Sequence, residues 1–138
     1  MEKLKIMLDE GAYMPLRAHA TDAGLDLRSK ETKWVYAQNQ VMFDTGVHVQ
    51  LPTNTVGLIT SKSGLMSKGL TSRGTIDVGY TGSLKVVLYN HTNEGYLVHA
   101  GDKISQLVIV PCLTPKLEVV DSLGDTDRGE GGFGSTGK

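Results

Sequence analysis

Short segments in which apolar and polar residues mostly alternate recur along the 138-residue chain. They are rich in β-branched and aromatic side chains, and a period of two residues is typical of a strand with one face in the core. Clusters of turn-forming residues separate them at short intervals. We expect strands over residues 3–8, 34–37, 41–51, 55–60, 83–90, 96–99, 104–110 and 116–120. The pattern predicts an all-β fold of the sandwich, barrel or jelly-roll type.

One stretch, residues 63–70, is compatible with a helical turn. Ser63 has a hydroxyl side chain of the kind favoured at an N-cap, and Gly69 is a residue type that commonly ends a helix. A helix this short is not stable without tertiary contacts. We therefore expect a connector in this position.

The alternating pattern ends near Ser122. The last residues combine glycine, charged and hydroxyl side chains with almost no apolar ones. A segment of this composition buries too little apolar surface to fold alone. The sequence predicts one β domain over residues 1–121 and a flexible C-terminal arm over residues 122–138.

Charge and cysteine content narrow the range of partners. The 14 basic and 15 acidic side chains nearly cancel, so we expect neither a broad cationic face nor stable nucleic-acid binding. No apolar run approaches membrane-spanning length, and the N-terminal residues lack the apolar stretch of a secretion signal. Cys112 is the single cysteine and lies in an apolar run, which predicts a buried thiol and a cytoplasmic protein. The four histidines show no metal-ligand spacing, and we expect them to be surface or packing residues.

The arm contains two nucleotide-binding patterns. Gly132, Gly134 and Gly137 read G-x-G-x-x-G, and residues 132–138 read G-x-x-x-x-G-K. A P-loop needs a hydroxyl residue after the lysine and a following helix, and a Rossmann turn needs a helix and a strand; neither follows here. Glycine-rich ends are usually linkers, so on the arm alone a linker is the favoured interpretation, and the rest of the chain must decide its role.

Three internal stretches, residues 20–27, 61–65 and 74–82, concentrate small residues among polar ones. Glycine allows backbone N–H groups to approach a ligand closely. The chemically competent side chains that these stretches supply are Asp22, Asp26, Lys62, Ser63, Asp77 and Tyr80. Such a set is able to bind a phosphorylated ligand and its metal, although turns, a helix cap and core packing would explain the same residues singly.

Five stretches follow one another in a set order: ATDAGLDL, SKSGL, GTIDVGYTG, GDKISQL and RGEGGFGSTG. In order and spacing they closely resemble the five motifs of the homotrimeric deoxyuridine triphosphatases (dUTPases), over nearly the whole chain. The resemblance implies a jelly-roll-like β barrel, a homotrimer with active sites built between subunits, and an arm that closes over a neighbour's site. That family hydrolyses dUTP to dUMP and pyrophosphate by attack of water on the α-phosphorus, which limits uracil in DNA.

The resemblance also implies roles for single residues. Asp77 would be the general base that deprotonates the attacking water. Tyr80 would pack under the deoxyribose and exclude a 2′-hydroxyl, and Asp26 would hold a water of the Mg²⁺ that the triphosphate carries. The implied substrate-binding residues are Lys62, Ser63, Gly64, Thr71, Ser72, Gly74, Ile76, Tyr80, Gln106, Arg128, Phe133, Gly134, Ser135 and Thr136.

Within that set, the hairpin at residues 71–74 would read the uracil edge with its backbone, and Ser63, Gly64 and Gln106 would contact phosphate oxygens. In the arm, Phe133 would stack on uracil, while Arg128 and the residues after Phe133 would surround the phosphates.

Two residues depart from the family pattern. Lys62 stands where the second motif usually has arginine, so positive charge is kept but a bidentate contact is lost. Thr71 stands where many relatives have asparagine in the uracil hairpin.

Two alternatives compete with hydrolysis of dUTP. The related dCTP deaminases have a catalytic glutamate ten positions after the aspartate, where this chain has the apolar Val87. A regulatory role through a protein partner is left open by the sequence, but no unusual insertion between the third and fourth motifs offers a docking site.

Overall fold

The structure, a computed structural model, describes residues 2–137 and consists almost entirely of strands. The strands are β1 (Lys5–Leu8), β2 (Gly24–Arg28), β3 (Lys33–Val35), β4 (Gln40–Asp44), β5 (Val47–Gln50), β6 (Thr55–Thr60), β7 (Leu70–Thr71), β8 (Arg73–Ile76), β9 (Lys85–Asn90), β10 (Tyr96–Val98) and β11 (Lys103–Pro111). One helical turn, α1 (Ser63–Met66), lies between β6 and β7. The predicted all-β class is confirmed.

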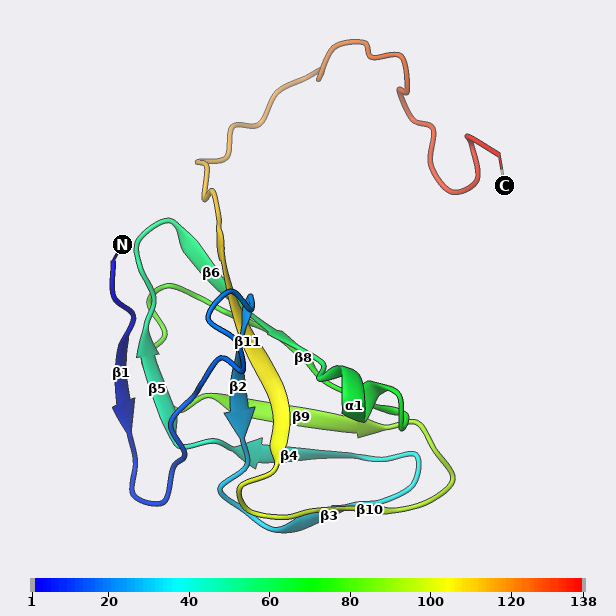
Figure 1. Cartoon of the computed structure of the whole chain (residues 1–138). Coiled ribbons are helices and arrows are strands. Elements are labelled where there is room, and N and C mark those ends of the chain that lie inside the picture. The colour runs from blue at the N-terminus through cyan, green and yellow to red at the C-terminus, as the bar shows by residue number, and fades with distance from the viewer. Residues whose placement is uncertain (1, 138) are drawn as a thin grey trace.

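The strands pair antiparallel in four separate sheets. The largest has the order β2-β11-β6-β8, the next has the order β4-β9-β7, and two-stranded pairs β1-β5 and β10-β3 complete the fold. Figure 1 shows the long strand β11 crossing in front of β9, with β1 and β5 at one side and α1 at the other. Within residues 2–137 no sheet closes on itself by hydrogen bonds, so the fold is jelly-roll-like with open edges.

Alternation along the strands builds the core. In β9, Val86 and Leu88 are buried while Lys85 is exposed, and Phe43 of β4 and Leu107 of β11 pack into the same cluster. Burying a side chain of this size stabilises the fold by roughly 1.5–3 kcal/mol. The core therefore follows from the period-two pattern that the sequence shows.

A tight turn divides the segment expected as one strand over residues 41–51. Gly46 has a φ of 68°, a left-handed conformation that glycine adopts without a steric penalty. The buried hydroxyl of Thr45 donates to the carbonyl of Leu84 at 2.6 Å, which fixes the turn against the neighbouring loop. Strands β4 and β5 consequently belong to different sheets.

Two sequence-based predictions are wrong. Residues 116–120 do not form a strand; the side chains of Leu117 and Val119 are 95% and 99% exposed, because no strand of the same chain lies alongside to supply hydrogen bonds. Cys112 is only partly buried, because it follows the last residue of β11, where the chain leaves the sheet.

The helical turn differs in one detail from the prediction. Lys62, not Ser63, occupies the N-cap position, and it makes no side-chain cap hydrogen bond. Gly69 has a φ of 84° and its N–H donates to the Met66 carbonyl, so it terminates the turn as expected.

Beyond β11 the chain runs away from the sheets as an extended segment (Figure 1, orange to red). Across residues 2–137, the structure has no helix with the length and apolar character that a bilayer crossing demands.

Candidate active site

Strands β2 and β11 bring Asp26 and Gln106 directly opposite each other. The Asp26 side chain is only 7% exposed, and each of its carboxylate oxygens meets an ammonium group. The Nζ of Lys62 lies 2.5 Å from Oδ1 and the Nζ of Lys103 lies 3.2 Å from Oδ2. A carboxylate this buried requires such partners, since an unpaired charge away from water is costly.

The same contacts set the protonation state of Asp26. Burial favours the neutral carboxyl, but the hydrogen bonds from Lys62 and Lys103 outweigh it, so the pKa of Asp26 lies below its ordinary value. The group is therefore ionised at neutral pH. It places one fixed negative charge between two cations.

Gln106 reaches across β2 at a glycine. A Cβ at Gly24 would lie 2.1 Å from the Gln106 Oε1, so the amide occupies space that only glycine leaves free. The Gln106 Nε2 donates to the carbonyl of Ser61 at 3.2 Å. This bond connects β11 to the segment that enters α1.

Serine hydroxyls connect the same segment to the hairpin that follows α1. The Ser61 hydroxyl accepts from the Ser72 N–H and donates to the Ser72 carbonyl, both at 2.9 Å. The buried Ser72 hydroxyl lies 2.8 Å from the Ser105 hydroxyl, which donates to the Thr60 carbonyl. These hydroxyls form hydrogen bonds with backbone N–H and C=O groups of β6 and of the hairpin, and so hold α1 between β6 and β7.

The first turn of α1 faces outward. Ser63 and Gly64 are exposed, and the first N–H groups of a helix have no partner within the helix. Lys62 immediately precedes them and reaches back to Asp26. This segment presents N–H donors, a hydroxyl and an ammonium group together, a combination suited to phosphate oxygens.

The β7–β8 hairpin borders a cavity of about 360 Å³ lined by Ser61, Thr71, Ser72, Arg73, Tyr89 and His91. Thr71 Oγ1 lies 2.8 Å from His91 Nε2, and the His91 ring stacks on Tyr89 with a centroid distance of 6.5 Å. Next on β8, Gly74 is exposed and Ile76 is half-buried against Gly57 of β6. The hairpin backbone at Arg73 and Gly74 is accessible to a ligand.

Asp77 and Tyr80 lie beyond the opposite end of β8 from Arg73. Both are exposed, and the Tyr80 N–H donates to the Asp77 carbonyl at 3.0 Å. The Tyr80 hydroxyl donates to the Ser83 carbonyl, and its ring lies over Gly82, where a Cβ would be 2.6 Å from that hydroxyl. Tyr80 is therefore a surface residue held in one orientation.

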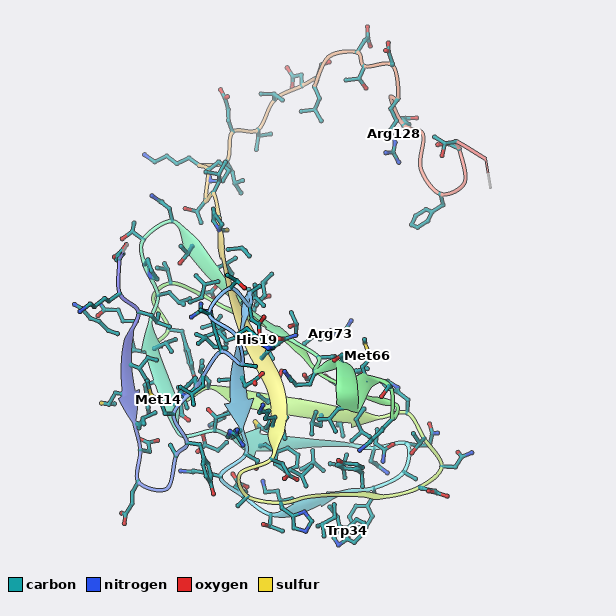
Figure 2. All side chains as sticks on the ribbon, in the orientation of Figure 1. Met14, His19, Trp34, Met66, Arg73 and Arg128 are labelled. Atoms are coloured by element: carbon teal, nitrogen blue, oxygen red, sulfur yellow. The ribbon has the colours of Figure 1, made fainter. Side chains whose placement is uncertain are left out.

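The arm residues are remote from both groups. Figure 2 shows Arg128 on the extended arm, well away from Arg73 and Met66. Arg128 Nε donates to the Gly131 carbonyl at 2.7 Å, and Phe133 is completely exposed. Gly134 has a φ of 76°, and Ser135 and Thr136 are exposed. The residue Lys138 lies outside the described residues.

One chain therefore divides the predicted site into three parts. Asp26, Lys62, Ser63, Gly64 and Gln106 come together around α1, and the bonds between Ser61 and Ser72 hold the β7–β8 hairpin beside them. Asp77 and Tyr80, beyond the far end of β8, form a second part, and the arm forms a third. Three residues that support the first part were not predicted from the sequence: Ser61, Ser105 and Lys103. The signal was present, since Lys103 and Ser105 flank an apolar residue in the GDKISQL stretch.

The side chains of the site determine how a metal ion would bind. Nowhere in residues 2–137 do three or more His, Cys, Asp or Glu side chains cluster closely enough to hold a metal ion. Asp26 supplies a carboxylate beside Lys62, and Mg²⁺ commonly binds through one or two carboxylates, several waters and substrate phosphates. The residues fit a magnesium ion that arrives with phosphates better than one held by protein alone.

Comparison with known proteins identifies the family. A model of the dUTPase family matches residues 10–137. The chain belongs to the dUTPase family. Its dUTPase relatives include the deoxyuridine 5′-triphosphate nucleotidohydrolase of Clostridium acetobutylicum, which is 45% identical over 142 residues, covering 99% of this chain and 98% of that protein. The enzyme of the same name from Paramecium bursaria Chlorella virus 1 is 42% identical over 132 residues, covering 94% of each.

Solved dUTPase structures share the fold. The Staphylococcus bacteriophage 80alpha dUTPase, solved with dUpNHpp, matches with a TM-score of 0.93 and 35% identity over 100% of both chains. A mutant dUTPase from phage phi11 of S. aureus, described as coordinating a structural Mg(II) ion, matches with a TM-score of 0.82 and 36% identity over 88% of this chain and 99% of that one.

Proposed function

We propose that the chain hydrolyses dUTP to dUMP and pyrophosphate and so limits uracil incorporation into DNA. The observation that carries the proposal is the polar group beside the exposed first turn of α1, in which Lys62 contacts Asp26 and Gln106 contacts Ser61. It occurs in a chain 45% identical, over 99% of its length, to a deoxyuridine 5′-triphosphate nucleotidohydrolase.

Asp77 is the proposed general base. Its carboxylate is exposed and follows β8 directly, so a water molecule can approach it. Asp77 accepts a proton from that water as the water oxygen forms a bond to the α-phosphorus. The bond between the α-phosphorus and the oxygen that bridges to the β-phosphorus then breaks, and pyrophosphate leaves with the electron pair.

The segment at α1 stabilises the leaving group. Lys62 supplies positive charge, while the Ser63 hydroxyl, the Gly64 N–H and the Gln106 amide supply hydrogen-bond donors for the phosphate oxygens. Donors held in place before the reaction stabilise developing charge without the cost of reorganising. The link from Gln106 to Ser61 keeps this set in position.

Magnesium, when bound with the triphosphate, neutralises charge on its oxygens. Asp26 would hold it through a water molecule. Because Lys62 and Lys103 already contact the carboxylate, Asp26 remains ionised whether or not the nucleotide is present.

Selection of the substrate rests on the hairpin and the loop after it. Backbone groups from Thr71 to Gly74, the Ser72 side chain and Ile76 would form the uracil site. Cytosine presents a mismatched donor or acceptor there, which leaves buried polar groups unpaired. Tyr80, held by its bond to Ser83, would pack under the deoxyribose and leave no room for a 2′-hydroxyl.

We further propose a homotrimer in which each site combines the three parts from different subunits. Asp77 lies a strand length of roughly 13 Å from the end of β8 near α1, taking about 3.3 Å per residue. The arm points away from its own sheets (Figure 2). Association of copies brings the parts together, and the arm then covers a neighbour's site with Phe133 on the uracil and Arg128, Gly134, Ser135 and Thr136 around the phosphates.

The test is a product assay with dUTP, UTP, dCTP and dTTP in the presence of Mg²⁺. The proposal predicts that dUTP yields dUMP and pyrophosphate and that the other three nucleotides are hydrolysed far more slowly. Release of orthophosphate from dUTP, release of ammonia from dCTP, or equal rates with dUTP and UTP would refute it.

A further inference from the structure

His48, near the middle of β5, connects three segments of the chain. Its Nδ1 lies 2.8 Å from the Thr81 carbonyl oxygen, and its Nε2 lies 3.0 Å from Oδ1 of Asp9, in the turn after β1. The His48 side chain is 18% exposed, whereas its partner Asp9 is 41% exposed. Both ring nitrogens therefore face oxygen atoms of the protein.

Both oxygens are acceptors, which determines the form of the ring. A backbone carbonyl and a carboxylate accept hydrogen bonds, and a neutral imidazole has only one N–H to donate. Both bonds form together only when His48 is an imidazolium. When the ring loses a proton, one of its two nitrogens becomes an acceptor and faces an oxygen that is also an acceptor.

The surrounding charges favour the imidazolium. The bond to Thr81 and then the bond to Asp9 raise the pKa of His48 above its ordinary value, and the negative charges of Asp9 and Asp44 act in the same direction. Lys5 of β1 lines the same cavity of about 280 Å³ as His48 and Thr81, and Lys30 pairs with Asp44. The loop itself presents a carbonyl to the ring, at Thr81.

The contact between His48 and Thr81 lies next to a predicted site residue. Thr81 directly follows Tyr80 in the loop that also carries Asp77. The next anchors of that loop lie farther along, where the Ser83 hydroxyl donates to Asp44 and the Leu84 N–H donates to the Val47 carbonyl at 2.8 Å. His48 is thus the side chain that holds the loop at the residue beside Tyr80.

We propose that His48 is a positioning residue, which as an imidazolium ties the loop of Asp77 and Tyr80 to the turn after β1. The inference rests on the proposed function, since it assigns the loop a role in sugar selection and catalysis. Deprotonation of His48 releases Thr81 or Asp9 and gives Tyr80 more freedom. Discrimination against the 2′-hydroxyl then weakens as pH rises.

The first test follows the contact itself, without reference to activity. NMR titration of the full chain would monitor the His48 ring and the backbone amides of Tyr80 and Thr81. The amides are expected to shift with the midpoint of the ring in the wild type and to lose that step in His48→Gln. In Asp9→Asn, which keeps an acceptor but removes its charge, ring and amides should titrate together at lower pH. Amides that do not follow the ring would overturn the proposal.

The second test measures the ratio of kcat/KM for dUTP and UTP against pH. Ionisation of the phosphates and of the general base affects both nucleotides, so it largely cancels in the ratio. We expect the ratio to fall roughly three- to tenfold through the His48 midpoint, as for loss of one ordinary hydrogen bond, and to be low and independent of pH in His48→Gln. A ratio unchanged in that variant would also overturn the proposal.

A matched control is His99→Gln. His99 also lies near an aspartate, Asp102, with 3.7 Å between Nδ1 and Oδ2, but it is 65% exposed and far from the loop in sequence. This variant should behave as the wild type in both tests. If the wild type does not hydrolyse dUTP, the proposed function fails while the NMR titration still decides whether His48 holds the loop.

Discussion

At the scale of single residues, Asp26 is the charged residue with the least exposure among residues 2–137. Its folded-state pKa is depressed, so its ion pairs with Lys62 and Lys103 stabilise the fold above the pKa of the unfolded chain. This stability is lost as pH falls through the folded-state pKa. The decrease of the free energy of unfolding at acid pH should therefore depend on the two lysines.

Replacement of Lys62 by methionine tests this dependence. Methionine keeps much of the apolar stem but leaves one Asp26 oxygen without its ammonium partner, so the pKa of Asp26 should rise and the acid-side loss of stability should begin at higher pH. We expect a cost near neutral pH of roughly 1–3 kcal/mol, as for loss of a hydrogen bond to a charged group. Urea unfolding between pH 3 and 7 measures both effects.

The control for that experiment is Lys116→Met, at an exposed position beyond β11. It removes the same charge from the chain without touching Asp26. If both variants show the same acid limb, the pairing between Lys62 and Asp26 does not set the pH dependence.

Some contacts of single residues could not be predicted from the sequence. Asp26 and Gln106 could be named from their motifs, but the opposition of these two residues across β2 and β11 is a matter of strand register. His48 was expected to be a surface or packing residue because the four histidines lack metal-ligand spacing, and its partners, Asp9 and Thr81, are 39 and 33 positions away. No local pattern reports a contact of that kind.

At the scale of elements, the period-two pattern predicted the strands whose one face is buried, and it failed where burial has another cause. Strand β2 has four consecutive buried residues, Gly24 to Leu27, so alternation does not mark it. The segment over residues 116–120 has the pattern of a strand but lacks a neighbour within the chain. Alternation of apolar and polar residues indicates that a strand has one buried face, but it does not indicate whether a second strand lies alongside to pair with it.

Gly24 of β2 offers a prediction at this scale. In Gly24→Ala the new Cβ would meet Gln106 Oε1 at 2.1 Å, so the amide must turn away and lose its bond to Ser61. The amide carbon, at 2.8 Å, moves with the end of this flexible side chain, and Gln106 Cβ, at 3.1 Å, has to give by only a few tenths of an ångström. We therefore expect the free energy of unfolding to change by less than about 1 kcal/mol, while kcat/KM for dUTP falls roughly five- to thirtyfold, the equivalent of about 1–2 kcal/mol.

A matched substitution is Gly95→Ala, where the added Cβ would meet the Trp34 ring at an ordinary contact distance of 3.4 Å. It should leave both quantities nearly unchanged. A loss of stability in Gly24→Ala as large as the loss of activity would mean that Gly24 serves the sheet and not the position of Gln106. Thermal unfolding and steady-state kinetics on the same preparations separate the two cases.

At the scale of the whole molecule, the central claim is that no single chain forms a complete site. The group around α1, the loop of Asp77 and the arm lie apart in the structure, and the family resemblance alone suggested from sequence that subunits would combine them. Closed rings of identical subunits use head-to-tail interfaces, in which different surfaces of the same chain meet. Such an interface lets one subunit complete the site of the next.

Mixing two inactive variants tests this claim most directly. Asp77→Asn keeps the arm but lacks the general base, and deletion of residues 127–138 keeps the base but lacks the arm; each alone should lose roughly 10²- to 10⁴-fold in kcat, if loss of the arm costs as much as loss of the base. When the two are unfolded together and refolded as mixed trimers, about a quarter of the sites should combine an intact Asp77 with a neighbour's intact arm and regain activity with dUTP. If the mixture stays as inactive as its components while still forming trimers, the site is not shared between subunits and the account is wrong.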